Sequence, residues 1–139
     1  RPDLFVWDHA RGRLARVTRG ANVRQGDPSP DGRAAAAVRC AAGTCDLVRV
    51  ELATGRVTTL RAGTLDSVWT RPRWSPDGAR LVAGVQANGR WRVVLLDAAR
   101  PDAAPRALGP TDDAERYDAA FADDGRTVVY VSEAGGIPN

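Results

Sequence analysis

The tetrapeptide Ser75-Pro76-Asp77-Gly78 decides the fold, because it recurs at a regular interval along the chain. An earlier copy is Ser29-Pro30-Asp31-Gly32, and a degraded copy follows at Ala122-Asp123-Asp124-Gly125. The interval is 46 residues and then 47 residues. In the two full copies Pro presets φ and Gly accepts a positive φ, so each copy predicts a tight turn that closes a hairpin.

A second alignment supports the same repeat. The segment from Asp3 to Gly20 lies without gaps on the segment from Asp46 to Gly63, and both contain a Gly-Arg turn. A period of about 40 to 50 residues that holds only short strands is typical of β-propeller blades. The repeat therefore predicts a run of propeller blades.

The fullest repeat predicts four strands, at residues 68–74, 81–85, 91–97 and 106–108. Turn signals separate the first three of them, and the last strand is short and outermost. Four strands leave no room for a helix, and no window shows a sustained apolar spacing of 3.6 residues. The fold class is therefore predicted as all-β, with blades of four antiparallel strands.

Both ends of the chain fall inside a repeat. We read residues 1–139 as a single propeller segment, with a half blade at 1–20, blades at 21–63 and 64–109, and a half blade at 110–139. About three blades' worth of strands does not close a ring, since propellers typically have four to eight blades. We expect either a segment of a longer chain, which we favour, or two copies that complete each other's split blades.

The segment from Pro72 to Ala83, followed by a strand that ends Leu96-Asp97, resembles the repeat of TolB-type six-bladed propellers. The same repeat occurs in the propeller domains of prolyl-oligopeptidase-like serine peptidases. The resemblance implies that this chain is half of a six-bladed ring. Pro28 stands where the repeat has an aromatic residue, and Ala122-Asp123 replaces Ser-Pro, so we expect looser packing in those two blades.

Composition limits the classes of partner. The chain is 43% hydrophobic and 27% charged with a net charge of +3, which is ordinary for a folded globular protein. Every basic residue is Arg, and with the many Ala residues this indicates a bacterial genome of high GC content. The arginines are interspersed with acids, so we expect no nucleic-acid partner. No apolar stretch approaches the ~18 residues of a membrane span, and a signal peptide, if one exists, lies outside this sequence.

Cys40 and Cys45 are the only cysteines, and they bracket a short loop between two predicted strands. They can form a disulfide if their Cβ atoms point to the same face; the alternatives are two free thiols or half of a metal site. A metal site would have few further ligands, because the chain has one His. A disulfide predicts an oxidising location, periplasmic or secreted. TolB-like proteins are envelope proteins, which agrees with that location.

No catalytic motif is present: the sequence lacks a Gly-x-Ser-x-Gly elbow, a His-Glu-x-x-His pair and a phosphate-binding Gly-rich loop. His9 is interpreted as a turn residue. The one local concentration of acidic residues fits no calcium loop and is interpreted as solvated; its members are Asp112, Asp113, Asp118, Asp123 and Asp124. We therefore predict no catalytic residues, no metal and no cofactor in this chain, although a parent protein could be a peptidase.

Binding remains as the predicted role. In propellers the loops between blades, together with the loops between second and third strands, crowd one face. The candidates on that face are Arg24, Trp69, Arg71, Arg116 and Tyr117, since Trp, Tyr and Arg most often anchor interfaces. Trp69 and Tyr117 could instead pack between blades. Trp74, Trp91 and Phe121 are assigned to that packing.

Three functions follow as hypotheses. The first is a non-catalytic TolB-like scaffold that binds a protein or peptide in the bacterial envelope. The second is the propeller of a prolyl-oligopeptidase-like peptidase, which would control substrate access to a hydrolase domain. The third is a self-complementing homodimer that forms a complete ring.

Overall fold

The computed structural model describes residues 1–133, and every regular element in that part of the chain is a β-strand. Two sheets have four antiparallel strands each, in sequence order. The first contains β3 (Val23–Pro28), β4 (Ala34–Ala41), β5 (Thr44–Glu51) and β6 (Val57–Arg61). The second contains β7 (Ser67–Trp74), β8 (Arg80–Ala87), β9 (Arg90–Asp97) and β10 (Arg106–Ala107). The predicted all-β fold with four-stranded antiparallel blades is confirmed.

Each end of the described chain forms a two-stranded sheet. β1 (Phe5–Asp8) pairs with β2 (Arg13–Arg16), and β11 (Arg116–Phe121) pairs with β12 (Val128–Ser132). Residues 134–139, the end of the predicted half blade at 110–139, lie outside the described residues. Within residues 1–133 no helix is long and apolar enough to span a membrane.

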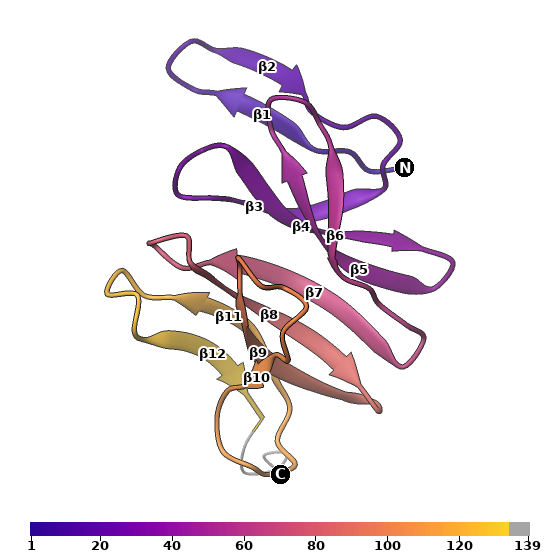
Figure 1. Cartoon of the computed structure of the whole chain (residues 1–139), viewed down its shortest axis with the longest axis vertical. Coiled ribbons are helices and arrows are strands. Elements are labelled where there is room, and N and C mark those ends of the chain that lie inside the picture. Colours follow the sequence, from indigo (N-terminus) through magenta and orange to yellow (C-terminus); the bar gives the residue numbers. More distant parts are fainter. Residues whose placement is uncertain (134–139) are drawn as a thin grey trace.

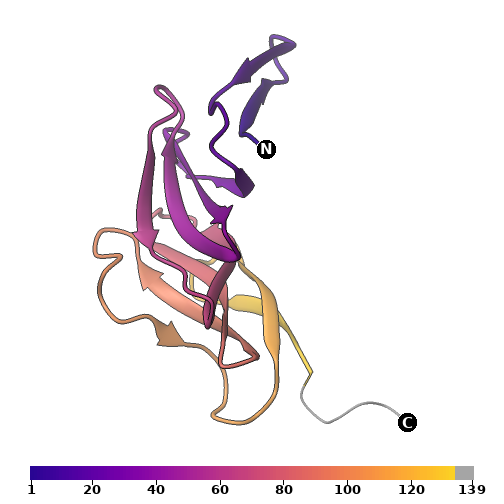
Figure 2. The same ribbon diagram turned by 90° about the vertical axis from the view of Figure 1, so that its right-hand side faces the viewer.

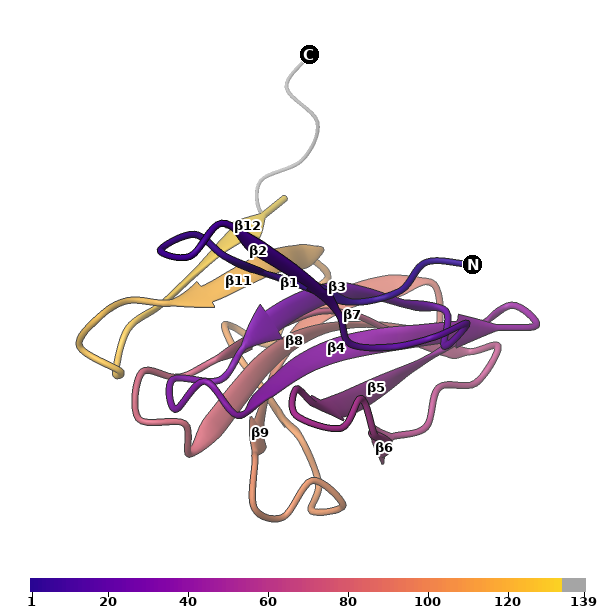
Figure 3. The same cartoon turned by 90° about the horizontal axis from the view of Figure 1, so that it is seen from above.

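The N-terminal hairpin of β1 and β2 and the two complete blades follow one another along the long axis of the molecule, and β11 and β12 lie beside the second complete blade (Figure 1). The view turned by 90° shows the same arrangement, with the N-terminal hairpin at the top and β11 and β12, in yellow, beside the second complete blade (Figure 2). Seen from above, β3 and β7 lie on one side of the stack and β6 and β9 on the opposite side (Figure 3). The first strand of each repeat is therefore the inner strand, and the last is the outer one.

The core lies between sheets rather than within one. The largest cluster joins Val38 and Leu47 of the first complete blade to Trp69, Leu81 and Leu96 of the second. Two further clusters fill the spaces between these blades and the terminal hairpins. Strand β4 is buried on both faces, and its run of four Ala residues, at most 3% exposed, lets the neighbouring sheets approach closely.

The Ser-Pro-Asp-Gly turns explain why the motif repeats. Ser75 Oγ accepts a hydrogen bond from the Arg80 N–H at 3.0 Å and donates one to Asp77 at 2.6 Å. Gly78 has a φ of 72°, which only glycine adopts without strain. The hydrogen bond from Ser75 is the main reason that the pKa of Asp77 is lowered. The earlier copy around Ser29 has the same bonds.

The degraded copy at residues 122–125 forms a similar turn with different hydrogen bonds. Asp124 accepts hydrogen bonds from the Arg126 and Thr127 N–H groups, both at 2.8 Å, and Thr127 Oγ1 donates to it at 2.7 Å. Gly125 again has a positive φ. Thr127 therefore supplies the hydroxyl that Ala122 lacks.

The junctions between blades share a second repeated feature, an Asp side chain that accepts hydrogen bonds from backbone N–H groups. Asp3 accepts hydrogen bonds from the Gly20 and Ala21 N–H groups at 2.8 and 3.0 Å and from Arg16 at 2.6 Å. These donors, Ala21 foremost and then Arg16, hold the pKa of Asp3 far below its usual value. Asp46 accepts from the Gly63 N–H at 2.8 Å in the same way. The alignment of residues 3–20 on 46–63 thus reflects one carboxylate that fixes the chain where it enters the next blade.

Candidate functional site

The three inner strands share an unusual backbone position. Gln25 in β3, Arg71 in β7 and Asp118 in β11 have φ values of 57°, 45° and 56°, a left-handed conformation that is uncommon for side chains of this kind. They are separated by 46 and 47 residues, the period of the repeat. In each strand the register with its neighbour shifts at this point, which identifies a β-bulge.

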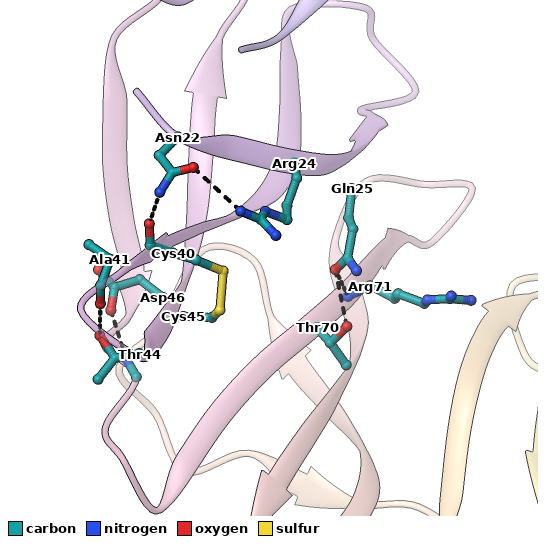
Figure 4. Close-up of a disulfide and its surroundings, with 11 residues drawn as sticks. Asn22, Arg24, Gln25, Cys40, Ala41, Thr44, Cys45, Asp46, Thr70 and Arg71 are labelled. Carbon is teal, nitrogen blue, oxygen red and sulfur yellow. Dashed lines mark hydrogen bonds between the residues drawn. A yellow bond between two sulfur atoms is a disulfide. The ribbon is translucent and has the colours of Figure 1, made fainter. Parts of the chain in front are cut away.

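The bulges connect one blade to the next. Gln25 Oε1 accepts hydrogen bonds from the Arg71 N–H at 2.8 Å and from Thr70 Oγ1 at 3.0 Å (Figure 4). The Arg71 guanidinium in turn lies 2.8 Å from Asp118 Oδ1. The three bulged residues therefore form a continuous polar row along the inner strands, from β3 across β7 to β11.

A pocket of about 450 Å³ lies along this row. Its volume is within the range of small-ligand and peptide side-chain sites. Glu115 and Glu133 flank the β11–β12 hairpin at its open end and line the pocket. The other lining residues, from β3, β7, β9 and β11, are Gln25, Thr70, Arg71, Trp91, Tyr117 and Asp118.

Acidic groups dominate the electrostatics of this pocket. The Tyr117 hydroxyl donates a hydrogen bond to Glu133 Oε1 at 2.9 Å. This bond, together with the charges of Glu133, Asp118 and Glu115, raises the pKa of Tyr117. With three carboxylates and one guanidinium among its lining residues, the pocket has a net negative charge.

A second hollow, of about 590 Å³, lies between the turns of two neighbouring repeats. Its carboxylates include Asp77 and Asp124, which already accept hydrogen bonds within their own turns. The first pocket is therefore the better candidate, although it is the smaller. No group of three or more potential metal ligands occurs in residues 1–133.

The structure separates the five predicted binding residues. Arg71 and Tyr117 line the pocket. Arg24 is exposed outside it and lies 3.4 Å from Asn22 Oδ1. Trp69 is only 4% exposed and packs between the two complete blades, and Arg116 is only 2% exposed and forms two hydrogen bonds with Asp112. For Trp69 the structure shows the alternative that the sequence left open, packing between blades, and for Arg116 the prediction of an exposed side chain on a binding face is corrected.

Sequence reasoning missed most of the pocket. Trp91, assigned to packing between blades, is half-buried and lines the pocket instead. Gln25 was not singled out and Asp118 was interpreted only as a solvated acidic residue, because three different residue types at the bulge form no motif. Their spacing, which equals the repeat period from Arg71 in both directions, was the available signal.

The disulfide between Cys40 and Cys45 is present (Figure 4). The two residues are directly opposite each other at the end of the β4–β5 hairpin, with Cα atoms 4.1 Å apart. The predicted pairing is confirmed, and the alternatives of free thiols or a metal site are excluded for these two residues. Asn22 Nδ2 donates to the Cys40 carbonyl and fixes this hairpin to the start of β3.

Comparison with solved structures identifies the architecture. TolB from Acinetobacter baumannii superposes with a TM-score of 0.76 at 19% identity, over 96% of this chain and 33% of TolB. The chain has the fold of a TolB-like β-propeller. It spans about a third of the length of that TolB, and identity this low establishes the fold alone.

Peptidase propellers share the TolB-like fold. A prolyl endopeptidase matches with a TM-score of 0.67 at 15% identity, over 94% of this chain and 21% of the peptidase. The β-propeller domain of the Trilobed protease from Pyrococcus furiosus matches with a TM-score of 0.62 at 13% identity, over 97% of this chain and 41% of that domain. No protein-family model and no curated protein matches the sequence.

Proposed function

We propose that the chain is a non-catalytic, TolB-like propeller segment that binds a protein or peptide partner in the bacterial envelope. The observation that carries the proposal is the pocket along the inner strands, which combines Trp91 and Tyr117 with polar and charged groups from three successive sheets. Aromatic and Arg side chains around a concavity are the usual anchors of protein recognition.

The envelope location is supported by the disulfide. Disulfides persist in oxidising compartments such as the periplasm and are rare in the cytosol, where thiols are kept reduced. The Cys40–Cys45 bond closes a short hairpin, and these two residues are the only cysteines in the sequence. We therefore infer that the protein functions in the periplasm or outside the cell.

The test is a binding screen with the disulfide-bonded chain against an immobilised library of random peptides. We expect saturable binding to a subset of the peptides. The double substitution Trp91→Ala/Tyr117→Ala should abolish it, since both side chains line the pocket. Arg106→Ala is the matched control, because Arg106 is exposed on the outer strand β10. A library without saturable binding, or binding that the double variant retains, overturns the proposal.

A second candidate is the propeller of a prolyl-oligopeptidase-like peptidase, which controls access to a hydrolase domain. The likeness to the prolyl endopeptidase over 94% of the chain favours it. The sequence of the complete gene distinguishes the scaffold from the peptidase propeller. A downstream Gly-x-Ser-x-Gly elbow followed by Asp and His supports the peptidase, and a frame without them supports the scaffold.

A third candidate is a homodimer in which two copies complete each other's split blades. The apolar side chains exposed on both terminal hairpins favour it, among them Phe5, Trp7 and Val129. Light scattering on a sizing column tests it: a dimer has a mass of about 30 kDa, twice the 14.8 kDa of one chain. A folded, strictly monomeric chain excludes this candidate.

A further inference from the structure

The charges that line the pocket are unbalanced. Glu115, Asp118 and Glu133 face a single cation, Arg71. Arg71 is paired with Asp118 at 2.8 Å, so it leaves the other two carboxylates uncompensated. Among residues 1–133, neither Glu115 nor Glu133 forms an ion pair. This local excess of negative charge contrasts with the net charge of +3 of the whole chain.

The two aromatic rings of the pocket, in contrast to three other rings among the described residues, have no Arg guanidinium over their faces. Elsewhere, an Arg guanidinium lies 5.8 to 5.9 Å from the centre of an aromatic ring in three places: Arg16 over Phe5, Arg49 over Trp74 and Arg61 over Trp69. Within the described part of the chain, neither Trp91 nor Tyr117 has such a cation. Both rings instead line a pocket that holds carboxylates.

Uncompensated carboxylates beside open aromatic faces form a site for a cation with an apolar stem. Carboxylates attract a guanidinium or ammonium group, and the face of an aromatic ring adds a cation–π contribution. The raised pKa of Tyr117 agrees with the negative field of the site. A free anion would be repelled, and a purely apolar ligand would leave both carboxylates desolvated without a partner.

We propose that this pocket binds a basic side chain, Arg or Lys, of the partner's peptide segment, with the cation between Glu115 and Glu133 and its stem against Trp91 and Tyr117. The inference rests on the proposed function, because it specifies the chemistry of the peptide that the scaffold binds. Because the Arg71 guanidinium is paired with Asp118, it does not neutralise Glu115 and Glu133, and these two carboxylates remain available to a basic ligand.

The experiment is an NMR titration of the ¹⁵N-labelled, disulfide-bonded chain with three capped peptides: acetyl-Gly-Arg-Gly-amide, acetyl-Gly-Lys-Gly-amide and acetyl-Gly-Glu-Gly-amide. The indole N–H of Trp91 is the reporter. The indoles of Trp69 and Trp74, which are 4% and 9% exposed, are internal references. We expect the two basic peptides to shift the Trp91 signal in a saturable way that weakens as NaCl is raised. The Glu peptide should leave the signal unchanged.

Substitutions then assign the effect to individual side chains. Glu115→Gln and Glu133→Gln should each weaken binding of the Arg peptide by about two- to fivefold, as expected for a partly exposed ion pair. Glu51→Gln is the matched control, because Glu51 is an exposed carboxylate at the end of β5, outside the pocket. Unchanged signals of Trp69 and Trp74 in every variant confirm that the fold is intact.

Each outcome is decisive. Equal or tighter binding of the Glu peptide overturns the inference, and so does binding of the Arg peptide that survives both Glu substitutions together. If the random library yields ligands but they are acidic or apolar, only this inference fails and the scaffold function stands. If the library yields none, the proposed function fails with it.

Discussion

The two complete blades and the two terminal hairpins contain the same repeat but differ in what covers them. In β5, Val48 and Val50 are fully buried against the N-terminal hairpin. The residues at the equivalent positions of β1, 43 residues earlier, are Phe5 and Trp7, which are 50% and 59% exposed. The strands are alike, so the difference arises from packing: described residues of a neighbouring sheet cover Val48 and Val50 but not Phe5 and Trp7.

The other end of the described chain shows the same contrast. Val82 in β8 is fully buried against β11 and β12, whereas Val129, one repeat later in β12, is 64% exposed. A propeller blade buries its apolar residues only when another blade lies on each face, as in other repeat proteins. Stability in this chain is therefore concentrated in the interfaces between sheets.

The largest effect that we predict comes from truncating an interface residue. Leu81 is 1% exposed and belongs to the cluster between the complete blades. Leu81→Ala should lower the free energy of unfolding by about 2 to 5 kcal/mol, because it removes buried apolar atoms and leaves a cavity. Val129→Ala, at an exposed position on the terminal hairpin, should change it by about 0.5 kcal/mol or less. Urea unfolding monitored by tryptophan fluorescence measures both.

Similar losses for the two variants would contradict the comparison. They would mean that Val129 is covered in solution, by a second copy or by another segment. Repeating the measurement at several protein concentrations separates those cases, since only association between chains makes the unfolding midpoint depend on concentration.

The fold could be predicted from the sequence because its determinants are local. The turn at Ser75-Pro76-Asp77-Gly78 is fixed by hydrogen bonds that lie within the six residues from Ser75 to Arg80. The disulfide could also be predicted, because a short hairpin brings Cys40 and Cys45 opposite each other.

The site could be predicted only in part, because it depends on neighbours that are distant in sequence. Trp69 and Trp91 both occupy strands of the same blade, yet one is covered by the preceding blade and the other lines a pocket. Nothing local distinguishes them. The bulge residues were harder still, since Gln25 and Asp118 share only a backbone conformation and a repeat position.

The disulfide allows a comparison between the two complete blades themselves. Cys40 and Cys45 pair across β4 and β5, and one repeat later Gln86 and Trp91 occupy the same paired positions in β8 and β9. Reduction should lower the free energy of unfolding by about 2 kcal/mol, the loop-closure value for a bond that joins residues five apart. Urea unfolding with and without reductant measures it.

A double substitution, Cys40→Ser/Cys45→Ser, is the control for reduction. It should be as unstable as the reduced protein and should no longer respond to reductant. A wild-type protein whose unfolding is unaffected by reduction, with loss of the bond verified by thiol titration, would show that the β4–β5 hairpin needs no covalent restraint. The hairpin would then match its uncrosslinked counterpart in the next blade.

The smallest predicted effect concerns acid stability of the N-terminal hairpin. The Ala21 N–H and then Arg16 lower the pKa of Asp3, so this carboxylate stabilises the fold above its unfolded pKa of about 3.9 and loses that contribution as the pH falls. Asp3→Asn should therefore be less stable than the wild type at pH 7, and the difference should shrink as the pH drops below about 4. Denaturant unfolding of both proteins between pH 7 and pH 3 measures this difference. A gap that stays constant with pH would show that Asp3 acts through hydrogen bonds that Asn reproduces poorly, and not through its charge.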